Sequence, residues 1–125
     1  MTIRFTSIIS VPVSDQQRAK DFYVNTLGFE LRRESPFGEG TTWIEVAPVG
    51  AETALTLVNW FPTMQPGSMK GLVFMTDDIA ADYAALTERG VVFADTPQQQ
   101  PWGTFATFND PDGNGWVLSQ PPAGM

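Results

Sequence analysis

The chain has 125 residues, a formal net charge of −7, and neither cysteine nor histidine. This length suits one domain with a substantial core. The acidic balance argues against nucleic acid as a partner, because nucleic-acid binding needs basic surfaces. Without Cys or His the chain lacks disulfides, thiolates, the usual ligands of zinc, iron, nickel and copper, and the commonest general base near neutral pH.

No apolar run approaches the roughly 18–20 residues that a membrane span requires. The first ten residues also lack the charged region and long apolar segment of a signal peptide. We therefore expect a cytoplasmic protein with neither a membrane nor a nucleic acid as partner.

Alternating apolar residues predict a first strand over Ile3–Val13, with its odd-numbered positions facing the core. Ser14 is the expected N-cap of the following helix, and Gln17 completes a capping-box pattern. Gly28 stands where the helix should end. Helical spacing predicts that the buried face of this helix carries Ala19, Phe22, Tyr23 and Thr26.

The rest of the first half reads as turns alternating with strands. Turn residues cluster at Ser35–Gly40 and Pro48–Glu52, and the strands are expected at Phe29–Arg33, Thr41–Ala47 and Thr53–Trp60. Residues 61–70 contain two prolines and a glycine with no periodicity, which indicates a linker.

The second half repeats this order in shortened form. A strand is expected over Gly71–Thr76, then a helix that Asp77 or Asp78 caps and Gly90 ends. Val91–Ala94 is predicted as a strand, Thr96–Pro101 as a loop, and Trp102–Phe108 with Gly115–Gln120 as a closing hairpin. Asp15 and Asp78 occupy equivalent helix starts, which indicates an internal duplication. The prediction is one domain over 1–125, with modules 1–60 and 71–120, the linker 61–70 and a tail 121–125.

Three segments together resemble the vicinal oxygen chelate superfamily, which includes glyoxalase I, bleomycin-resistance proteins and extradiol dioxygenases. They are VSDQQRAKDFYVNTLGFEL at 13–31, TDDIAADYAALTERGVVF at 76–93 and FNDPDGNGWVLSQ at 108–120. The resemblance implies an α+β fold in which two βαβββ modules form a curled mixed sheet around a cleft. It also implies a homodimer, because small members usually dimerise and often complete their clefts across subunits.

The metal chemistry of the superfamily does not carry over to these residues. In metal-using relatives a His stands in the first strand of each module, and Ile8 and Gly71 occupy those places. The ligand of the closing strand is replaced by Val117, and Thr53–Trp60 contains no acid, Gln or His. We therefore expect neither a metal nor another cofactor. Asp110–Gly115 matches the opening of an EF-hand loop, but position 12 would be Pro121, so we interpret it as a hairpin turn.

If Ile8 faces the cleft, as the resemblance implies, strand alternation assigns the other residues of the wall. This wall is aromatic and aliphatic, with a few hydroxyl groups and the carboxylate of Glu45, which suits a small-molecule site. The tryptophans could equally seal the core or a dimer interface, and Trp116 is expected in the core. The candidate ligand-binding residues are Ile8, Ser10, Trp43, Glu45, Thr56, Trp60, Met75, Trp102 and Val117.

The residues favour binding over catalysis. The first hypothesis is a metal-free binding protein of the bleomycin-resistance type, sequestering an antibiotic or another planar or cationic metabolite. The second is a cofactor-independent lyase or isomerase with Glu45 as the acid or base. The third is a catalytically inactive partner or regulatory relative, and a metal-dependent enzyme is the least favoured.

Overall fold

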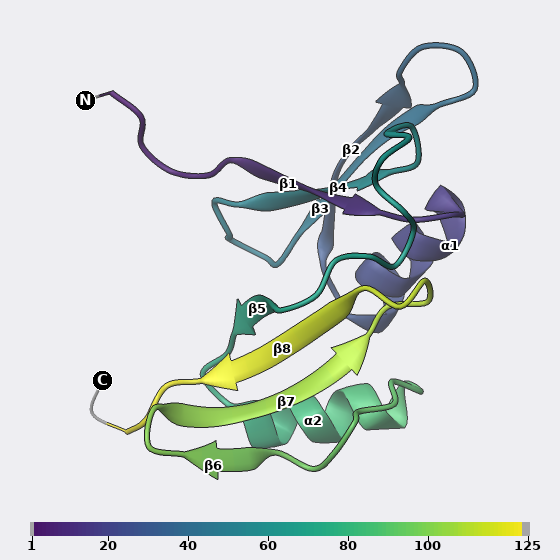
Figure 1. Ribbon diagram of the computed structural model, residues 1–125. Coiled ribbons are helices and arrows are strands. Elements are labelled where there is room, and N and C mark those ends of the chain that lie inside the picture. The colour runs from purple at the N-terminus through teal and green to yellow at the C-terminus, as the bar shows by residue number, and fades with distance from the viewer. Residues whose placement is uncertain (1, 124–125) are drawn as a thin grey trace.

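Two four-stranded sheets, each with its own helix, make up the computed structural model, which describes residues 2–123 (Figure 1). The first module contains β1 (Ile8–Pro12), α1 (Gln16–Asp21), the π-helical turn η1 (Phe22–Thr26), β2 (Glu30–Pro36), β3 (Thr42–Ala47) and β4 (Ala54–Val58). The second contains β5 (Leu72–Met75), α2 (Ile79–Glu88), β6 (Gln98–Gln100), β7 (Gly103–Asn109) and β8 (Gly115–Gln120).

The two sheets have the same topology. Their strand orders are β1-β4-β3-β2 and β5-β8-β7-β6. In each sheet the first strand pairs in parallel with the last strand of its module, and the remaining pairs are antiparallel. This confirms the predicted α+β fold of two βαβββ modules.

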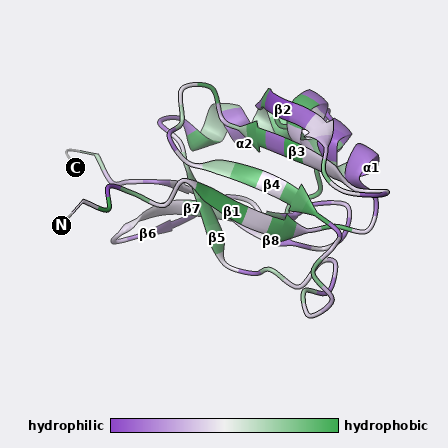
Figure 2. Cartoon of the chain, turned by 90° about the horizontal axis from the view of Figure 1, so that it is seen from above, coloured by the Kyte–Doolittle hydropathy of each residue, from purple (hydrophilic) through white to green (hydrophobic). Residues whose placement is uncertain are grey.

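One hydrophobic cluster joins the modules. From the first module it takes Val11, Ile44 and Leu57, and from the second Phe108 and Leu118, all of them buried. Hydrophobic residues concentrate on β1 and β4, whereas β2 and β6 are largely hydrophilic (Figure 2). The side of each sheet that carries the cluster is therefore its inner face, and the opposite side is its outer face.

The predicted first strand begins too early. Strand β1 starts at Ile8, which pairs with Ala54, the first residue of β4. Ser7 O still accepts from Ala54 N at 2.9 Å and Thr6 O from the Thr53 hydroxyl at 2.7 Å, but β4 begins at Ala54 and the strand pairing goes no further toward the N-terminus. Ile3 and Phe5, expected to face the core, are 79% and 42% exposed. The prediction was wrong for Ile3 and Phe5, because alternation within one segment does not show where its partner strand begins.

The predicted N-cap of the first helix was wrong by one residue. Asp15, in an extended conformation, caps α1 by accepting hydrogen bonds from the backbone N–H groups of Gln17 and Arg18, both at 3.1 Å. Ser14 instead donates its hydroxyl to Asp112 Oδ1 at 2.6 Å. The local pattern assigns the Ser14 side chain to the helix N-cap, but in the structure it bonds Asp112, which is 98 residues away in sequence. Gly28, with φ of 80°, ends the helical segment as predicted.

The second module departs from prediction at its edge strand. Val91–Ala94 contains one isolated bridge, between Phe93 and Phe108, rather than a strand. The edge strand is β6, inside the segment predicted as a loop, where Gln98 pairs with Phe105. Three glutamines carry no apolar alternation, so this strand forms through pairing with β7 and not through its own pattern. Asp78 caps α2 as one of the two predicted candidates.

The segment Asp110–Asn114 forms the hairpin turn between β7 and β8, as predicted, and also fastens the modules together. Asn114 is fully buried, and its amide nitrogen donates to Pro12 O and to Asp110 Oδ2, both at 2.8 Å. Its amide oxygen accepts from Met69 N at 3.1 Å. This one side chain therefore links the end of β1, the hairpin and the segment between the modules.

Among residues 2–123, no helix is long and apolar enough to cross a membrane. The predicted tail at 121–125 falls partly on residues 124–125, which lie outside the described residues. The division into modules and linker stays a prediction in its exact boundaries.

Candidate functional site

The outer face of the first sheet, called outer face A, carries a row of three polar side chains. Register places Ser10 of β1 and Glu45 of β3 on either side of Thr56 of β4. Directly paired residues project to the same side of a sheet, so the three side chains are neighbours. Ser10 and Glu45 are half-buried, and Thr56 is 1% exposed.

An aromatic cluster borders this row. It consists of Phe37, Trp43, Trp60 and Phe61. The rings of Trp43 and Trp60 are nearly parallel, at 27°, with centroids 6.2 Å apart. Phe37 lies 5.7 Å from Trp43 and 5.0 Å from Trp60, and Phe61 lies 5.9 Å from Trp60. Phe37 and Phe61 are 46% and 44% exposed, so the cluster is open to solvent at its margin.

Polar groups hold Trp43 from two directions. Its indole N–H donates to Glu45 Oε1 at 3.2 Å. The guanidinium of Arg33 lies 5.9 Å from its ring centroid, within cation–π range. Arg33 is the register partner of Glu45 in β2. The site thus offers stacking surfaces beside a carboxylate that already orients one of them.

The outer face of the second sheet, called outer face B, carries the remaining predicted residues. Val117 pairs with Val73, and Met75 follows two residues later in the same strand. Val73 and Met75 are 59% and 75% exposed. Trp102 is 57% exposed, and its ring stacks on Phe105 with centroids 5.3 Å apart at 24°. Outer face B is therefore a second apolar surface with its own aromatic pair.

The nine predicted site residues fall into two groups. Ile8, which is 38% exposed, lies on outer face A with Ser10, Trp43, Glu45 and Thr56, while Trp60 stacks on Trp43 at its edge. Met75, Trp102 and Val117 belong to outer face B. The inner faces share one hydrophobic cluster, so the outer faces of one chain point away from each other. Within one chain, the six predicted residues of outer face A and the three of outer face B therefore do not line a common binding site.

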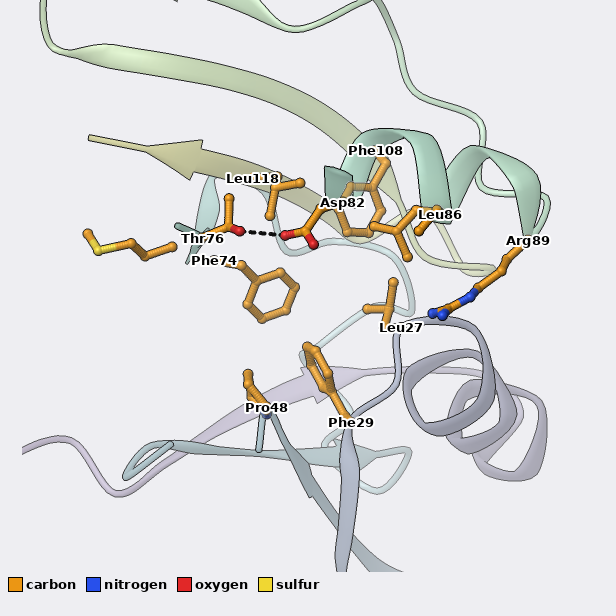
Figure 3. Close-up of a pocket in the computed structure, with 12 residues that line it drawn as sticks. Leu27, Phe29, Pro48, Phe74, Thr76, Asp82, Leu86, Arg89, Phe108 and Leu118 are labelled. Atoms are coloured by element: carbon orange, nitrogen blue, oxygen red, sulfur yellow. Dashed lines mark hydrogen bonds between the residues drawn. The ribbon is translucent and has the colours of Figure 1, made fainter. Parts of the chain in front are cut away.

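The seam between the modules holds a separate pocket of about 250 Å³. Its lining is mostly apolar and includes Arg89 and the pair Thr76–Asp82, in which the Thr76 hydroxyl donates to Asp82 Oδ2 at 2.5 Å (Figure 3). Arg89 crosses the seam to donate to Thr26 O at 3.0 Å. The facing walls are Leu27, Phe29 and Pro48 from the first module and Phe74, Phe108 and Leu118 from the second (Figure 3). This pocket lies mainly on the inner side of the sheets, and Met75 of outer face B also lines it.

Sequence reasoning missed three aromatic residues. Phe37 follows β2 in a segment predicted as a turn, and Phe61 lies in the predicted linker. Phe105 was placed in a strand but not in the site. Strand alternation cannot report a loop residue, although an aromatic residue beside a turn was a usable signal. Trp116 is buried as predicted, and its ring stacks on Phe74 at 3.9 Å.

The residues at the superfamily's metal-ligand positions do not fit a transition metal. Ile8 and Val117 have aliphatic side chains and Gly71 has none, while β4 offers the Thr56 hydroxyl among Ala54, Leu55, Leu57 and Val58. Such groups are poor ligands for zinc or iron. Across residues 2–123, no group of three or more His, Cys, Asp or Glu side chains is placed to hold a metal ion.

The comparisons with known proteins agree with this architecture. The antibiotic binding protein TnmS3 from Streptomyces sp. CB03234 has a similar structure, with 55% sequence identity, a TM-score of 0.92, and coverage of 98% of this chain and 99% of that one. A superfamily member from Sphaerobacter thermophilus is 38% identical, with a TM-score of 0.89 over 96% of this chain and 99% of that one. The protein YetH of Bacillus subtilis is 40% identical over 94% of this chain and 99% of its own length.

The family description matches residues 6–118, which is most of the chain and includes both modules. This confirms the resemblance on which the fold and the cleft were predicted. The chain belongs to the glyoxalase/bleomycin resistance protein/dioxygenase superfamily.

Proposed function

We propose that this chain is a metal-free protein that binds and sequesters a planar or cationic small molecule, an antibiotic for example. The observation that carries the proposal is the aromatic cluster on outer face A, with the Glu45 carboxylate beside it. Planar ligands stack on exposed aromatic rings, and cations are attracted both by the faces of indole rings and by a carboxylate. The net charge of −7 adds a long-range attraction for cations.

The relatives support the ligand class. TnmS3, described as an antibiotic binding protein, is 55% identical to this chain over nearly its full length. The poor donors at the metal-ligand positions support binding without a metal ion. The cytoplasmic location expected from the sequence stays a prediction.

We further propose that a homodimer completes the ligand cleft. Outer face A supplies the aromatic cluster of one copy, and outer face B supplies Met75, Trp102 and Val117 of the other. Ile8, Val73, Met75 and Trp102 are exposed apolar side chains in one chain, and a second copy would remove them from water. Ile3 and Phe5, which precede β1, are exposed apolar side chains as well.

A fluorescence titration tests the binding proposal. Tryptophan emission is followed while a panel of planar and cationic antibiotics is added, including bleomycin and an anthracycline. We expect saturable quenching by at least one compound. Trp43→Ala should weaken its binding at least about tenfold, because a stacking surface is lost, whereas Val49→Ala, at a residue 75% exposed in a turn, should leave it unchanged.

Glu45→Gln separates the two ligand classes. The substitution should weaken the binding of cationic compounds several-fold and leave the binding of neutral planar compounds nearly unchanged, because it removes the negative charge of residue 45 and keeps the shape of the side chain. A panel without any saturable response would refute the proposal. A stoichiometric transition metal in the purified protein would refute its metal-free part.

A further inference from the structure

Thr56 has a buried hydroxyl group that lacks a hydrogen-bond partner. The residue is 1% exposed, and among the described residues no atom lies within hydrogen-bonding distance and geometry of its Oγ1. Buried polar groups are nearly always paired, because burying one without a partner costs stability. Valine would fill almost the same space without this cost.

The position of Thr56 limits where a partner can come from. It lies between Ser10 and Glu45 across the sheet, and its neighbours along the strand on the same face are Ala54 and Val58. The Glu45 carboxylate accepts from the indole of Trp43 through Oε1 and does not bond Thr56. Backbone groups of the sheet are taken up by strand pairing. A partner must therefore approach from the outer side, where the aromatic cluster lies.

We propose that the Thr56 hydroxyl donates a hydrogen bond to an acceptor oxygen, such as a carbonyl, at the edge of the planar ligand. This inference rests on the proposed function and adds the polar group by which the site recognises its ligand. A ligand that stacks on Trp43 displaces the side chains covering the hydroxyl and brings its own oxygen in their place. The half-buried Ser10 and Glu45 mark the approach to it from solvent.

Two substitutions at Thr56 test the proposal, with the antibiotic of the fluorescence panel that binds the wild type most tightly as the probe. Thr56→Val should raise Tm by about 3 °C, because an unpaired hydroxyl is removed, and should weaken Kd about tenfold, because one hydrogen bond to the ligand is lost. Thr56→Ser keeps the hydroxyl and should hold Kd within about twofold of the wild type. Thermal unfolding and isothermal titration calorimetry supply the two readouts.

Thr42→Val is the matched control, because Thr42 lies in the same sheet at the register of the inner face, where Ile44 and Val46 point. It should leave Kd unchanged. Opposite changes in stability and affinity are the signature of a ligand-binding hydroxyl, since a purely structural role moves both in one direction. An unchanged Kd for Thr56→Val, or a loss of stability and affinity together, would overturn this inference alone. The absence of binding by the wild type would overturn it together with the proposed function.

Discussion

Tyr23 of the first module forms hydrogen bonds with two residues of the second module through its hydroxyl group. Its hydroxyl oxygen accepts from the indole N–H of Trp116 and donates its proton to Asp110 Oδ2, each at 2.8 Å. The residue is fully buried. Burial, followed by the charge of Asp110, raises the pKa of Tyr23 well above its ordinary value of 10.0. The folded protein therefore holds the tyrosine proton more tightly than the unfolded chain does.

Removing this hydroxyl should destabilise the fold. Tyr23→Phe keeps the ring but leaves the Trp116 N–H unpaired and takes one donor from a buried carboxylate, so the free energy of unfolding should fall by about 1–3 kcal/mol. Urea denaturation measures it. Tyr83→Phe is the matched control, because the Tyr83 ring packs on Phe93 and no hydrogen bond of its hydroxyl is found within residues 2–123. Equal losses in both variants would show that the Tyr23 network contributes nothing specific.

The raised pKa of Tyr23 also predicts a pH dependence. Above pH 10 the unfolded chain loses the tyrosine proton and the folded chain keeps it, so this contribution is complete below pH 10 and declines above it. The slope is about −1.4 kcal/mol per pH unit. The destabilisation caused by Tyr23→Phe should therefore be smaller at about pH 11 than at about pH 8, by roughly that amount. A difference that is independent of pH would contradict the assignment.

At the scale of elements, the turn Asp110–Asn114 does more than reverse the chain. Asp110 Oδ1 accepts from the backbone N–H groups of Asp112 and Asn114, and Asn114 reaches Pro12 and Met69. Ser14 and Asp112 add an exposed contact between the modules. The turn therefore supplies several of the polar contacts between the modules, beside the bonds from Arg89 to Thr26 O and from Trp116 to Tyr23.

Asn114→Ala should therefore weaken the whole protein and not only the hairpin. It removes hydrogen bonds to three separate segments in a buried place, for an expected loss of about 2–4 kcal/mol in the free energy of unfolding. Asn59→Ala, at an exposed residue, should change it by less than about 0.5 kcal/mol. Urea denaturation monitored by far-UV and near-UV circular dichroism checks both. A loss no larger than that of Asn59→Ala would contradict the role of Asn114 as a link between the segments.

Much of this element-level structure was predictable from local pattern. Helix α2, the turn and β8 were predicted closely, because caps, glycines and alternation are local signals. The start of β1, the cap at Asp15 and the edge strand β6 were not, because each depends on a distant partner: Ala54, Asp112 or β7. Alternation correctly predicted that Ile44 and Val46 of β3 face the core. The aromatic residues Phe37 and Phe61 were missed, because they lie outside the strands and no periodicity applies to them.

The sequence alone does not determine whether outer faces A and B of one chain line a common cleft. Alternation assigned residues to faces, but which faces meet depends on how the modules pack, and the shared core uses the inner ones. Outer faces A and B therefore lie apart in one chain, although each carries aromatic side chains and exposed apolar residues. A cleft built from both requires a second copy, which is what the proposed homodimer supplies.

Mixing two inactive variants tests this arrangement directly. Trp43→Ala alters outer face A and Trp102→Ala alters outer face B, so each homodimer has two damaged clefts and both should bind the antibiotic weakly. In a mixed dimer one cleft carries both lesions and the other carries neither, because each cleft takes face A from one copy and face B from the other. Random exchange should restore about a quarter of the wild-type sites at full affinity. Calorimetry after joint refolding measures the restored sites, and size-exclusion chromatography with light scattering measures the mass. A monomeric mass, or a mixture without restored sites, would place the binding site within one chain.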